Sequence, residues 1–220
     1  MSRGEVGLAV FDLDGTLTRS DTLFPYALGF LLESPGRFPG ALLRLPAPVI
    51  LGGLRGDRGA VKSAVIRICL GGSTRARIAD WNSRFVPGLL AHGLHQDALK
   101  QLDLHKRSGA RLVLLSASTD LYVPAIARAL GFDETVCTGV RWNDEHLDGH
   151  LTTANCRGEE KARCVAEIRA RFPGVRAAAY GNAGSDLAHL RLVEEPLLVN
   201  GSPAARRAAR RLGIPCARWH

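Results

Sequence analysis

The stretch VGLAVFDLDGTL covers residues 6–17, and it decides the fold class of the chain. An apolar run ends there in two carboxylates, Asp12 and Asp14, which the turn residues Gly15 and Thr16 follow. A short apolar run without alternation is typical of a parallel strand that is buried on both faces. The stretch therefore predicts a central strand with polar side chains at its carboxyl end.

Further segments repeat this pattern of an apolar run followed by small or polar residues. They are RLVLLSAS at 111–118, VRAAAYGNAGSD at 175–186 and EEPLLVNGS at 194–202. A fifth strand is predicted over 134–143. The sequence HLDGHLTT at 146–153 predicts a hairpin arm that turns at Asp148 and Gly149.

Helical patterns lie between these strands, over residues 92–107, 119–130 and 158–172, and Thr119 is expected to cap the second. A short basic helix and a final short strand are expected at the C-terminal end. Alternating strands and helices predict an α/β fold, a Rossmann-like, doubly wound parallel sheet with helices on both faces. Ligands of such sheets bind beyond the carboxyl ends of the strands.

Residues 19–90 interrupt the alternation, because helical patterns dominate this segment and prolines and glycines divide them. The distance along the chain from Asp14 to Ser116 far exceeds the roughly 30 residues that a strand-helix-strand unit needs. We therefore expect a helical insertion directly after the first strand. The predicted domains are a catalytic core of residues 1–18 and 91–220, and a helical domain of residues 19–90.

The composition limits the classes of protein that the chain can belong to. Of its 220 residues 46% are hydrophobic, which is enough for a buried core. Five widely spaced cysteines without a Cys-x-x-Cys pair argue against a disulfide framework or a zinc ribbon, and favour the reducing cytoplasm. The apolar run at 45–54 is shorter than the about 20 residues that span a bilayer, and the N-terminal stretch does not resemble a signal peptide.

Basic residues outnumber acidic residues by 29 to 21, and the formal net charge is +8. This charge permits an anionic partner without identifying one. For residues 19–90, the excess of arginine fits either an anionic substrate or membrane surface, or a helical face in contact with solvent. We do not expect nucleic acid as a partner.

The two carboxylates of the first motif carry the strongest chemical signal. Residues two apart on a strand point to the same side, so Asp12 and Asp14 are expected to face one pocket. Carboxylates that lie so close repel each other and need a cation or a shared proton. Mg²⁺, completed by water and a substrate phosphate, meets that need. One Asp could then attack phosphorus while the other protonates the leaving group; the alternative is an Asp-Gly turn of purely structural role.

Three further sites add to this signal. At the end of the next strand, the Ser116 hydroxyl and the N–H of Ala117 could hold a phosphoryl oxygen, although Ser116 could equally cap a helix. Lys161 begins a helix after a glycine and could neutralise the phosphoryl charge, or it could be a surface residue. Asn182 and Asp186 follow a later strand and offer oxygen ligands for a hard cation.

Taken together and in this order, these residues resemble the haloacid dehalogenase superfamily. Its four motifs match FDLDGTL at 11–17, Ser116, Lys161 and GNAGSD at 181–186. The resemblance implies that Asp12 is the nucleophile, which forms an aspartyl phosphate, and that Asp14 is the acid/base. Phosphate-binding residues would be Ser116, Ala117 and Lys161, and Mg²⁺ would bind to Asp12, Asp14, Asn182 and Asp186. The dehalogenase members lack the second Asp, so Asp14 indicates phosphoryl transfer.

The position of the insertion is similar to the type 1 cap of this superfamily, in the branch that includes phosphoserine phosphatase. Two departures argue against phosphoserine as the substrate. Asp21 stands where that enzyme has a Glu, and Ala117-Ser118 replace two glycines. A third departure is Asn182, where the family commonly has Asp; the metal site thereby loses one negative charge.

The sequence therefore predicts a Mg²⁺-dependent phosphomonoester hydrolase that acts on a small phosphorylated metabolite in the cytoplasm. One alternative is a lipid-phosphate phosphatase, similar to the phosphatidylglycerophosphatases, that is peripheral at the inner membrane surface. Another is a non-catalytic binding protein with the same fold.

Overall fold

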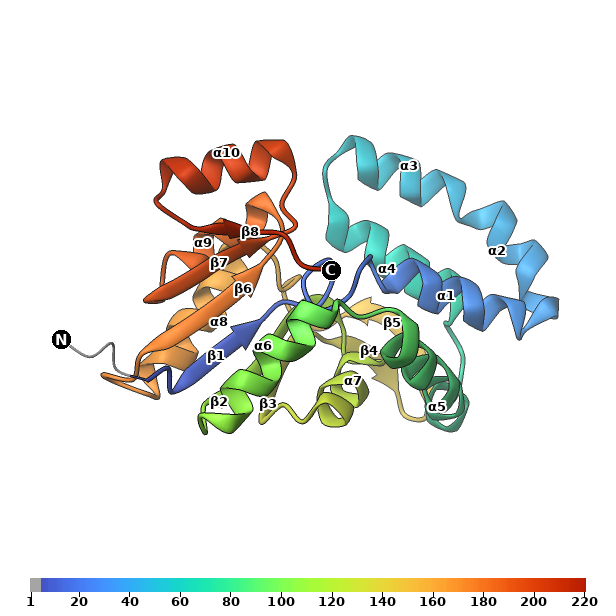
Figure 1. The fold of residues 1–220 in the computed structure, drawn as a ribbon. Helices are drawn as coiled ribbons and strands as arrows, with labels where there is room; N and C mark the ends of the chain where they lie inside the picture. The colour runs from blue at the N-terminus through green and yellow to red at the C-terminus, as the bar shows by residue number, and fades with distance from the viewer. Residues whose placement is uncertain (1–4) are drawn as a thin grey trace.

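The computed structural model describes residues 5–220 and contains a parallel six-stranded sheet in the order β3-β2-β1-β6-β7-β8 (Figure 1). The strand order runs in both directions from β1, so the sheet is doubly wound, as predicted. Its switch point lies where β1 meets β2 and β6, which is where such sheets bind ligands. The strands are β1 (Leu8–Phe11), β2 (Arg111–Thr119), β3 (Glu134–Thr138), β6 (Ala177–Gly181), β7 (Glu195–Val199) and β8 (Cys216–Ala217).

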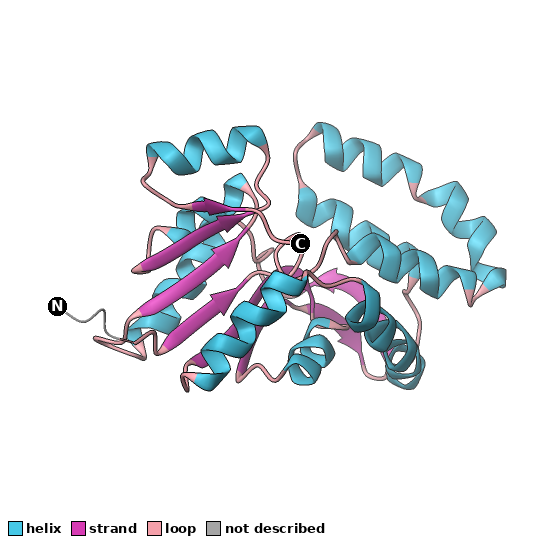
Figure 2. Ribbon diagram, viewed as in Figure 1, coloured by secondary structure: helices cyan, strands magenta, loops and turns pink. Residues whose placement is uncertain are grey.

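Both faces of the sheet are buried, because successive side chains of β1 enter different cores. Ala9 and Phe11 belong to one apolar cluster, and Leu8 and Val10 belong to the other. Helices α6 (Gln96–Arg107) and α7 (Val123–Leu130) cover the first face. The second is covered by α8 (Glu159–Ala170), α9 (Leu187–Leu190) and α10 (Pro203–Arg211) (Figure 2). This burial explains why the strands read as continuous apolar runs.

A helical insertion separates β1 from α6. It consists of α1 (Leu23–Leu32), the 3₁₀ turn η1 (Pro35–Arg37), α2 (Phe38–Arg44), α3 (Pro46–Leu54), α4 (Arg58–Cys69) and α5 (Arg75–His92). We call it the cap, because it stands over the carboxyl ends of the strands (Figure 1). An aromatic contact joins it to the core, since the ring of Tyr26 lies 4.4 Å from that of Tyr122, just before α7. Within residues 5–220, no helix is both long enough and apolar enough to cross a bilayer.

The chain passes into and out of the cap along two adjacent segments, residues 17–19 and 93–95, which we call the cap linkers. Arg19 N donates a hydrogen bond to Gly93 O at 2.8 Å, and His95 N donates one to Leu17 O at 2.9 Å. Thr18 and Leu94 form an antiparallel bridge between these bonds. The two connections of the cap therefore lie side by side as one short paired element.

The predicted fifth strand is wrong in its extent. Residues 134–143 form two strands, β3 and β4 (Val140–Asn143), and β4 leaves the main sheet to pair with β5 (His146–Leu151) in a separate antiparallel hairpin. Gly139 lies at the break, where its N–H bonds to the side chain of Thr153 instead of a neighbouring strand.

The predicted turn at Asp148 and Gly149 is also wrong, because both residues lie inside β5. The hairpin turns earlier, at Asp144, whose φ is 52°. Asp148 instead bonds across the hairpin to Arg141 at 2.6 Å. The glycine serves close packing, since a Cβ at residue 149 would lie 3.0 Å from the backbone N of Arg67 in α4.

The helix predicted over 119–130 begins later than expected. Thr119 is the last residue of β2, and α7 starts at Val123. The predicted helix over 92–107 starts at Gln96, since α5 continues as far as His92. The basic C-terminal helix and the final short strand are confirmed as α10 and β8.

Candidate active site

A pocket of about 460 Å³ lies between the carboxyl ends of the strands and the cap. It is lined by the loops after β1, β2 and β6, by the start of α8, and by residues of the cap. Most of the residues singled out in the sequence meet here, namely Asp12, Asp14, Ala117, Lys161, Asn182 and Asp186. The doubly wound topology thus brings four distant segments to one site.

Lys161 is the centre of the polar part of this pocket. Its Nζ lies 2.5 Å from Asp12 Oδ1 and 3.0 Å from Asp186 Oδ1, and only 2% of the residue is exposed. Burial alone would lower the pKa of Lys161, but the two carboxylates raise it above its ordinary value. The side chain is therefore a fixed ammonium, and the interpretation of Lys161 as a solvated surface residue is excluded.

The two carboxylates beside Lys161 differ in their surroundings. Burial raises the pKa of Asp12 to about 7, against the opposing effect of Lys161. Burial also acts to raise the pKa of Asp186, but Lys161 and His189 outweigh it and the pKa is lowered. The Asp186 carboxylate accepts hydrogen bonds from the backbone N–H groups of residues 182 and 183, at 3.0 and 2.8 Å. Asp186 is thus a firmly held anion.

Asp14 is oriented by hydroxyl groups rather than by a cation. Its Oδ1 accepts bonds from the N–H and the hydroxyl of Thr22, at 2.8 and 2.7 Å, and its Oδ2 accepts from Ser118 Oγ at 2.6 Å. The hydroxyl of Tyr122 lies 3.0 Å from that of Thr22 and supports it from behind. Burial, followed by the charge of Asp21, raises the pKa of Asp14. A carboxyl group with a raised pKa and a fixed direction can deliver a proton.

Ser116 is placed differently from the other predicted residues. It is fully buried and does not line the pocket. Its Oγ accepts a hydrogen bond from the N–H of Ser118 at 2.9 Å, within the stretch of β2 where the pairing with β3 shifts register. In this stretch, Ala117 and Ser118 are the residues that face the pocket.

Asn182 packs against Gly15 at the edge of the pocket. Gly15 has a φ of +79°, and a Cβ at this position would lie only 2.0 Å from Asn182 Nδ2. The glycine of the first motif is therefore required twice, by the backbone conformation and by the approach of the amide.

Several pocket residues were not identified from the sequence as site residues. Lys62 of α4 bonds to Asn155 Oδ1 at 2.6 Å and to the carbonyl of Ala117, and burial lowers its pKa to about 8. Arg58 and Arg157 add two further cations. The scarcity of lysine in the chain was a signal that could have marked Lys62 as a candidate site residue. Nothing in the sequence indicated which of the cap arginines faces the site.

A family model for haloacid dehalogenase-like hydrolases matches residues 9–191, which is most of the chain. The chain belongs to this family. The match spans the positions of all four motifs around the pocket.

Two relatives of this hydrolase share most of its length. Protein CicA of Caulobacter vibrioides is 35% identical over 211 residues, which cover 91% of this chain and 92% of CicA. A protein of Mycobacterium tuberculosis described as a probable phosphatase is 26% identical over 220 residues, which cover 94% of this chain and 73% of that protein.

Solved structures share the fold of the hydrolase, including its cap. A Bordetella pertussis protein of unknown function has a TM-score of 0.79 at 23% identity, and the match covers 95% of this chain and 96% of that one. A phosphoserine phosphatase, solved as an analogue of its phospho-aspartyl intermediate, has a TM-score of 0.65 at 16% identity, with coverage of 97% and 93%. The prediction of a fold like that of phosphoserine phosphatase is confirmed.

The donors at this site fit a magnesium ion. Asp12 and Asp186 present carboxylate oxygens to the same side of the pocket, where both contact Lys161, and Asn182 lies beside them. Mg²⁺ prefers hard oxygen ligands and commonly takes one or two carboxylates from the protein. Hydroxyl and N–H donors engage both carboxylate oxygens of Asp14 and fix its direction, and the predicted metal role of Asp14 stays a prediction.

The packing of Gly15 against Asn182 can be tested with alanine. Gly15→Ala should destabilise the hydrolase more than Gly109→Ala, because both residues have positive φ, but only Gly15 has a neighbour within contact of the added methyl group. We expect about 1–3 kcal/mol for the strained backbone in each variant, and about 1–3 kcal/mol more for the overpacking in Gly15→Ala. Urea unfolding measures both variants. Equal losses of unfolding free energy would show that Asn182 moves aside freely.

Proposed function

We propose that the protein is a Mg²⁺-dependent phosphomonoester hydrolase that works through an aspartyl-phosphate intermediate on a small phosphorylated metabolite. The observation that carries this proposal is that Asp12 is paired with the buried Lys161, while Asp14, two residues later in the chain, is oriented by other groups, including Ser118. The family match supports hydrolysis, and the relative described as a probable phosphatase supports phosphate esters as substrates. We place the reaction in the cytoplasm, in keeping with five unpaired cysteines.

In the first step, a carboxylate oxygen of Asp12 attacks the phosphorus atom in line with the ester oxygen. The bond between Asp12 and phosphorus forms as the bond to the leaving oxygen breaks, and Asp14 donates its proton to that oxygen. The alcohol then leaves. Thr16 and Lys161 hold Asp12 in position, with the Thr16 hydroxyl at 3.1 Å from Oδ2.

In the second step, a water molecule attacks the aspartyl phosphate. Asp14, now ionised, accepts the proton of this water, the bond between Asp12 and phosphorus breaks, and inorganic phosphate leaves. Both carboxylates then return to their original states. Asp14 thus acts once as acid and once as base, which its network with Thr22 and Ser118 allows without reorientation.

The charge of the transferred phosphoryl group is balanced by groups around Asp12. Lys161 lies against Asp12, and the N–H of Ala117, which lines the pocket, would hold one of the phosphoryl oxygens. Magnesium, held by Asp12, Asn182 and Asp186, would supply electrostatic stabilisation of the phosphoryl oxygens. No further group is needed for the chemistry at phosphorus.

The first prediction concerns the nucleophile. Asp12→Asn should reduce turnover of p-nitrophenyl phosphate by roughly four orders of magnitude or more, because an amide of the same shape cannot attack phosphorus. It should also abolish formation of the beryllofluoride adduct, and circular dichroism should remain that of the wild type. Asp103→Asn, at an exposed position of α6 outside the pocket, is the matched control and should retain turnover.

Wild-type turnover by Asp12→Asn would refute the mechanism. If the wild-type protein itself hydrolysed no phosphate ester in the presence of Mg²⁺, the alternative of a non-catalytic binding protein would stand instead.

The second prediction concerns the neutral residue in the metal site. Asn182→Asp should tighten Mg²⁺ binding, because it restores a negative charge, and each tenfold gain corresponds to about 1.4 kcal/mol. Asn182→Ala should weaken it, because an oxygen ligand is removed. The measurement is the Mg²⁺ concentration that half-activates each variant. Identical midpoints in all three proteins would assign the metal contact to Asp186 without Asn182.

A second candidate function follows from the surface of the cap. Most of the large apolar side chains that the structure leaves exposed lie in α1–α3, and Leu43 and Leu54 are 83% and 80% exposed. Phe24 and Val49 continue this apolar character into the wall of the pocket. Exposed apolar patches beside basic residues are typical of surfaces that bind membranes. The substrate would then be a lipid phosphate at an anionic membrane surface.

The third prediction tests this candidate. Leu43→Ser/Leu54→Ser should reduce binding to anionic phospholipid vesicles. The control variant Leu104→Ser/Leu192→Ser changes two exposed leucines outside the cap and should not reduce it. Binding should weaken steeply with salt, because exposed charges are screened within about 8–10 Å at physiological ionic strength. Vesicle co-sedimentation measures both effects. If the wild-type protein does not bind vesicles at low salt, the lipid-phosphate function is eliminated and soluble metabolites remain as the candidate substrates.

A further inference from the structure

We infer that the protein has a second anion-binding site, at the base of the cap and separate from the catalytic pocket. A hollow of about 720 Å³ lies on the other side of Gly15 and Asn182 from the catalytic residues. Segments that are far apart in the sequence converge on it. Its remaining lining residues are Arg19, His95, Asn200, Arg206, Arg218, Trp219 and His220.

The lining of this hollow includes three arginines and no Asp or Glu, and its one acidic group is the terminal carboxylate of His220. Within residues 5–220, the side chains of Arg206 and Arg218 form no ion pair or hydrogen bond, and Arg19 bonds only to the carbonyl of Leu94, at 3.1 Å. Arg169 of the core, by contrast, is paired with Glu194 at 2.6 Å. The hollow thus brings together three arginines that form no ion pair within residues 5–220.

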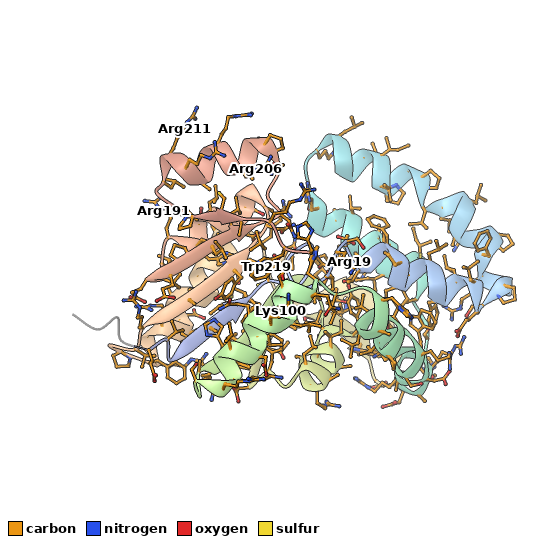
Figure 3. All side chains as sticks on the ribbon, viewed as in Figure 1. Arg19, Lys100, Arg191, Arg206, Arg211 and Trp219 are labelled. Atoms are coloured by element: carbon orange, nitrogen blue, oxygen red, sulfur yellow. The ribbon has the colours of Figure 1, made fainter. Side chains whose placement is uncertain are left out.

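These cations come from different parts of the chain. Arg19 belongs to a cap linker, Arg206 to α10, and Arg218 to the segment after β8. Figure 3 labels Arg19, Arg206 and Trp219 around the place where the C-terminal segment passes between α10 and the cap. Of the arginines of α10, Arg206 is the one that lines the hollow.

The floor of the hollow is rigid, because Asn200 ties three segments together. Its φ of 51° is unusual for a residue other than glycine. Its Oδ1 accepts a hydrogen bond from Trp219 N at 2.9 Å, and its Nδ2 lies 3.1 Å from His95 Nε2. These bonds fix the arrangement of Asn200, Trp219 and His95 at the hollow.

His95 is held in one orientation at the edge of the hollow. Because the Oδ1 of Asn200 accepts from Trp219, its amide nitrogen must face the ring, and Nε2 of His95 is therefore the acceptor. The proton of the neutral ring then lies on Nδ1, which is buried without any hydrogen-bond partner among the described residues. His95 thus lines the hollow in the neutral form that its bond to Asn200 fixes.

The chemistry of the lining identifies the class of ligand. Arginine holds phosphate and carboxylate groups through paired N–H donors. Three arginines on separate segments suit a compact molecule with at least two such groups, for example a diphosphate or a polycarboxylate. It cannot be the phosphoryl group under attack, because Asn182 and Gly15 stand between the hollow and Asp12.

Occupation of this site would affect the cap directly. Arg19 and His95 belong to the two cap linkers, whereas Arg206 and Arg218 belong to the core. A bridging anion would therefore fasten the linkers to the core and restrict movement of the cap. We thus assign to the hollow a regulatory anion that is distinct from the substrate.

The experiment is a calorimetric titration with inorganic pyrophosphate, and separately with citrate, in the absence of divalent cations. Arg206→Gln/Arg218→Gln should weaken binding at least about tenfold, because charge-assisted hydrogen bonds are lost. The control is Arg207→Gln/Arg211→Gln, which removes the same amount of charge from two arginines of α10 that do not line the hollow. It should change the affinity less than about twofold. If pyrophosphate binds and citrate does not, the site is specific for phosphate groups. If both bind, the site accepts polyanions in general.

Three results would overturn the inference. They are no binding by the wild-type protein, equal weakening in both double variants, and unchanged binding in both. The last would place the probe in the catalytic pocket. None of these readouts requires turnover, so failure of the proposed hydrolase activity would leave the test intact. Both double variants should retain the wild-type turnover of p-nitrophenyl phosphate when no probe is present.

Discussion

The ammonium group of Lys161, buried between Asp12 and Asp186, is the interaction on which the site depends. It joins the end of β1, the first turn of α8 and the loop after β6, and none of these segments is near another in the sequence. Withdrawing three charges from water is costly, and loss of one partner from such a group typically costs about 3–5 kcal/mol. The arrangement is thus better explained by what it positions than by what it adds to stability.

The rest of the site follows from that placement. Asp14 follows Asp12 by two residues, and its carboxylate accepts hydrogen bonds from the hydroxyl groups of Thr22 and Ser118. With Asp186 fixed, its loop brings the amide of Asn182 against Gly15. One carboxylate is therefore surrounded by a cation, and the other by hydroxyl groups. Two chemically identical side chains acquire different roles from their neighbours alone.

Much of this architecture could be predicted from the sequence, because it depends on local patterns. Buried parallel strands are continuous apolar runs, and Gly15 or Lys161 stand at fixed distances from them. What the sequence did not show depends on tertiary packing. Lys62 reaches the site only because α4 lies over the end of β2, and Gly149 resembles a turn until α4 is placed against β5. Ser116 illustrates the same limit, since its position in the motif did not reveal that it is buried and that, of this stretch, Ala117 and Ser118 line the pocket.

The paired cap linkers have a consequence for how such proteins diversify. Because the chain leaves the core and returns to it at adjacent points, the length and shape of everything between them are independent of the sheet. A different helical module could be spliced between residues 22 and 93 without disturbing Lys161 and its partners or the bonds from Thr22 to Asp14. Selection could thus exchange the part that chooses the substrate while the chemistry at phosphorus is inherited unchanged.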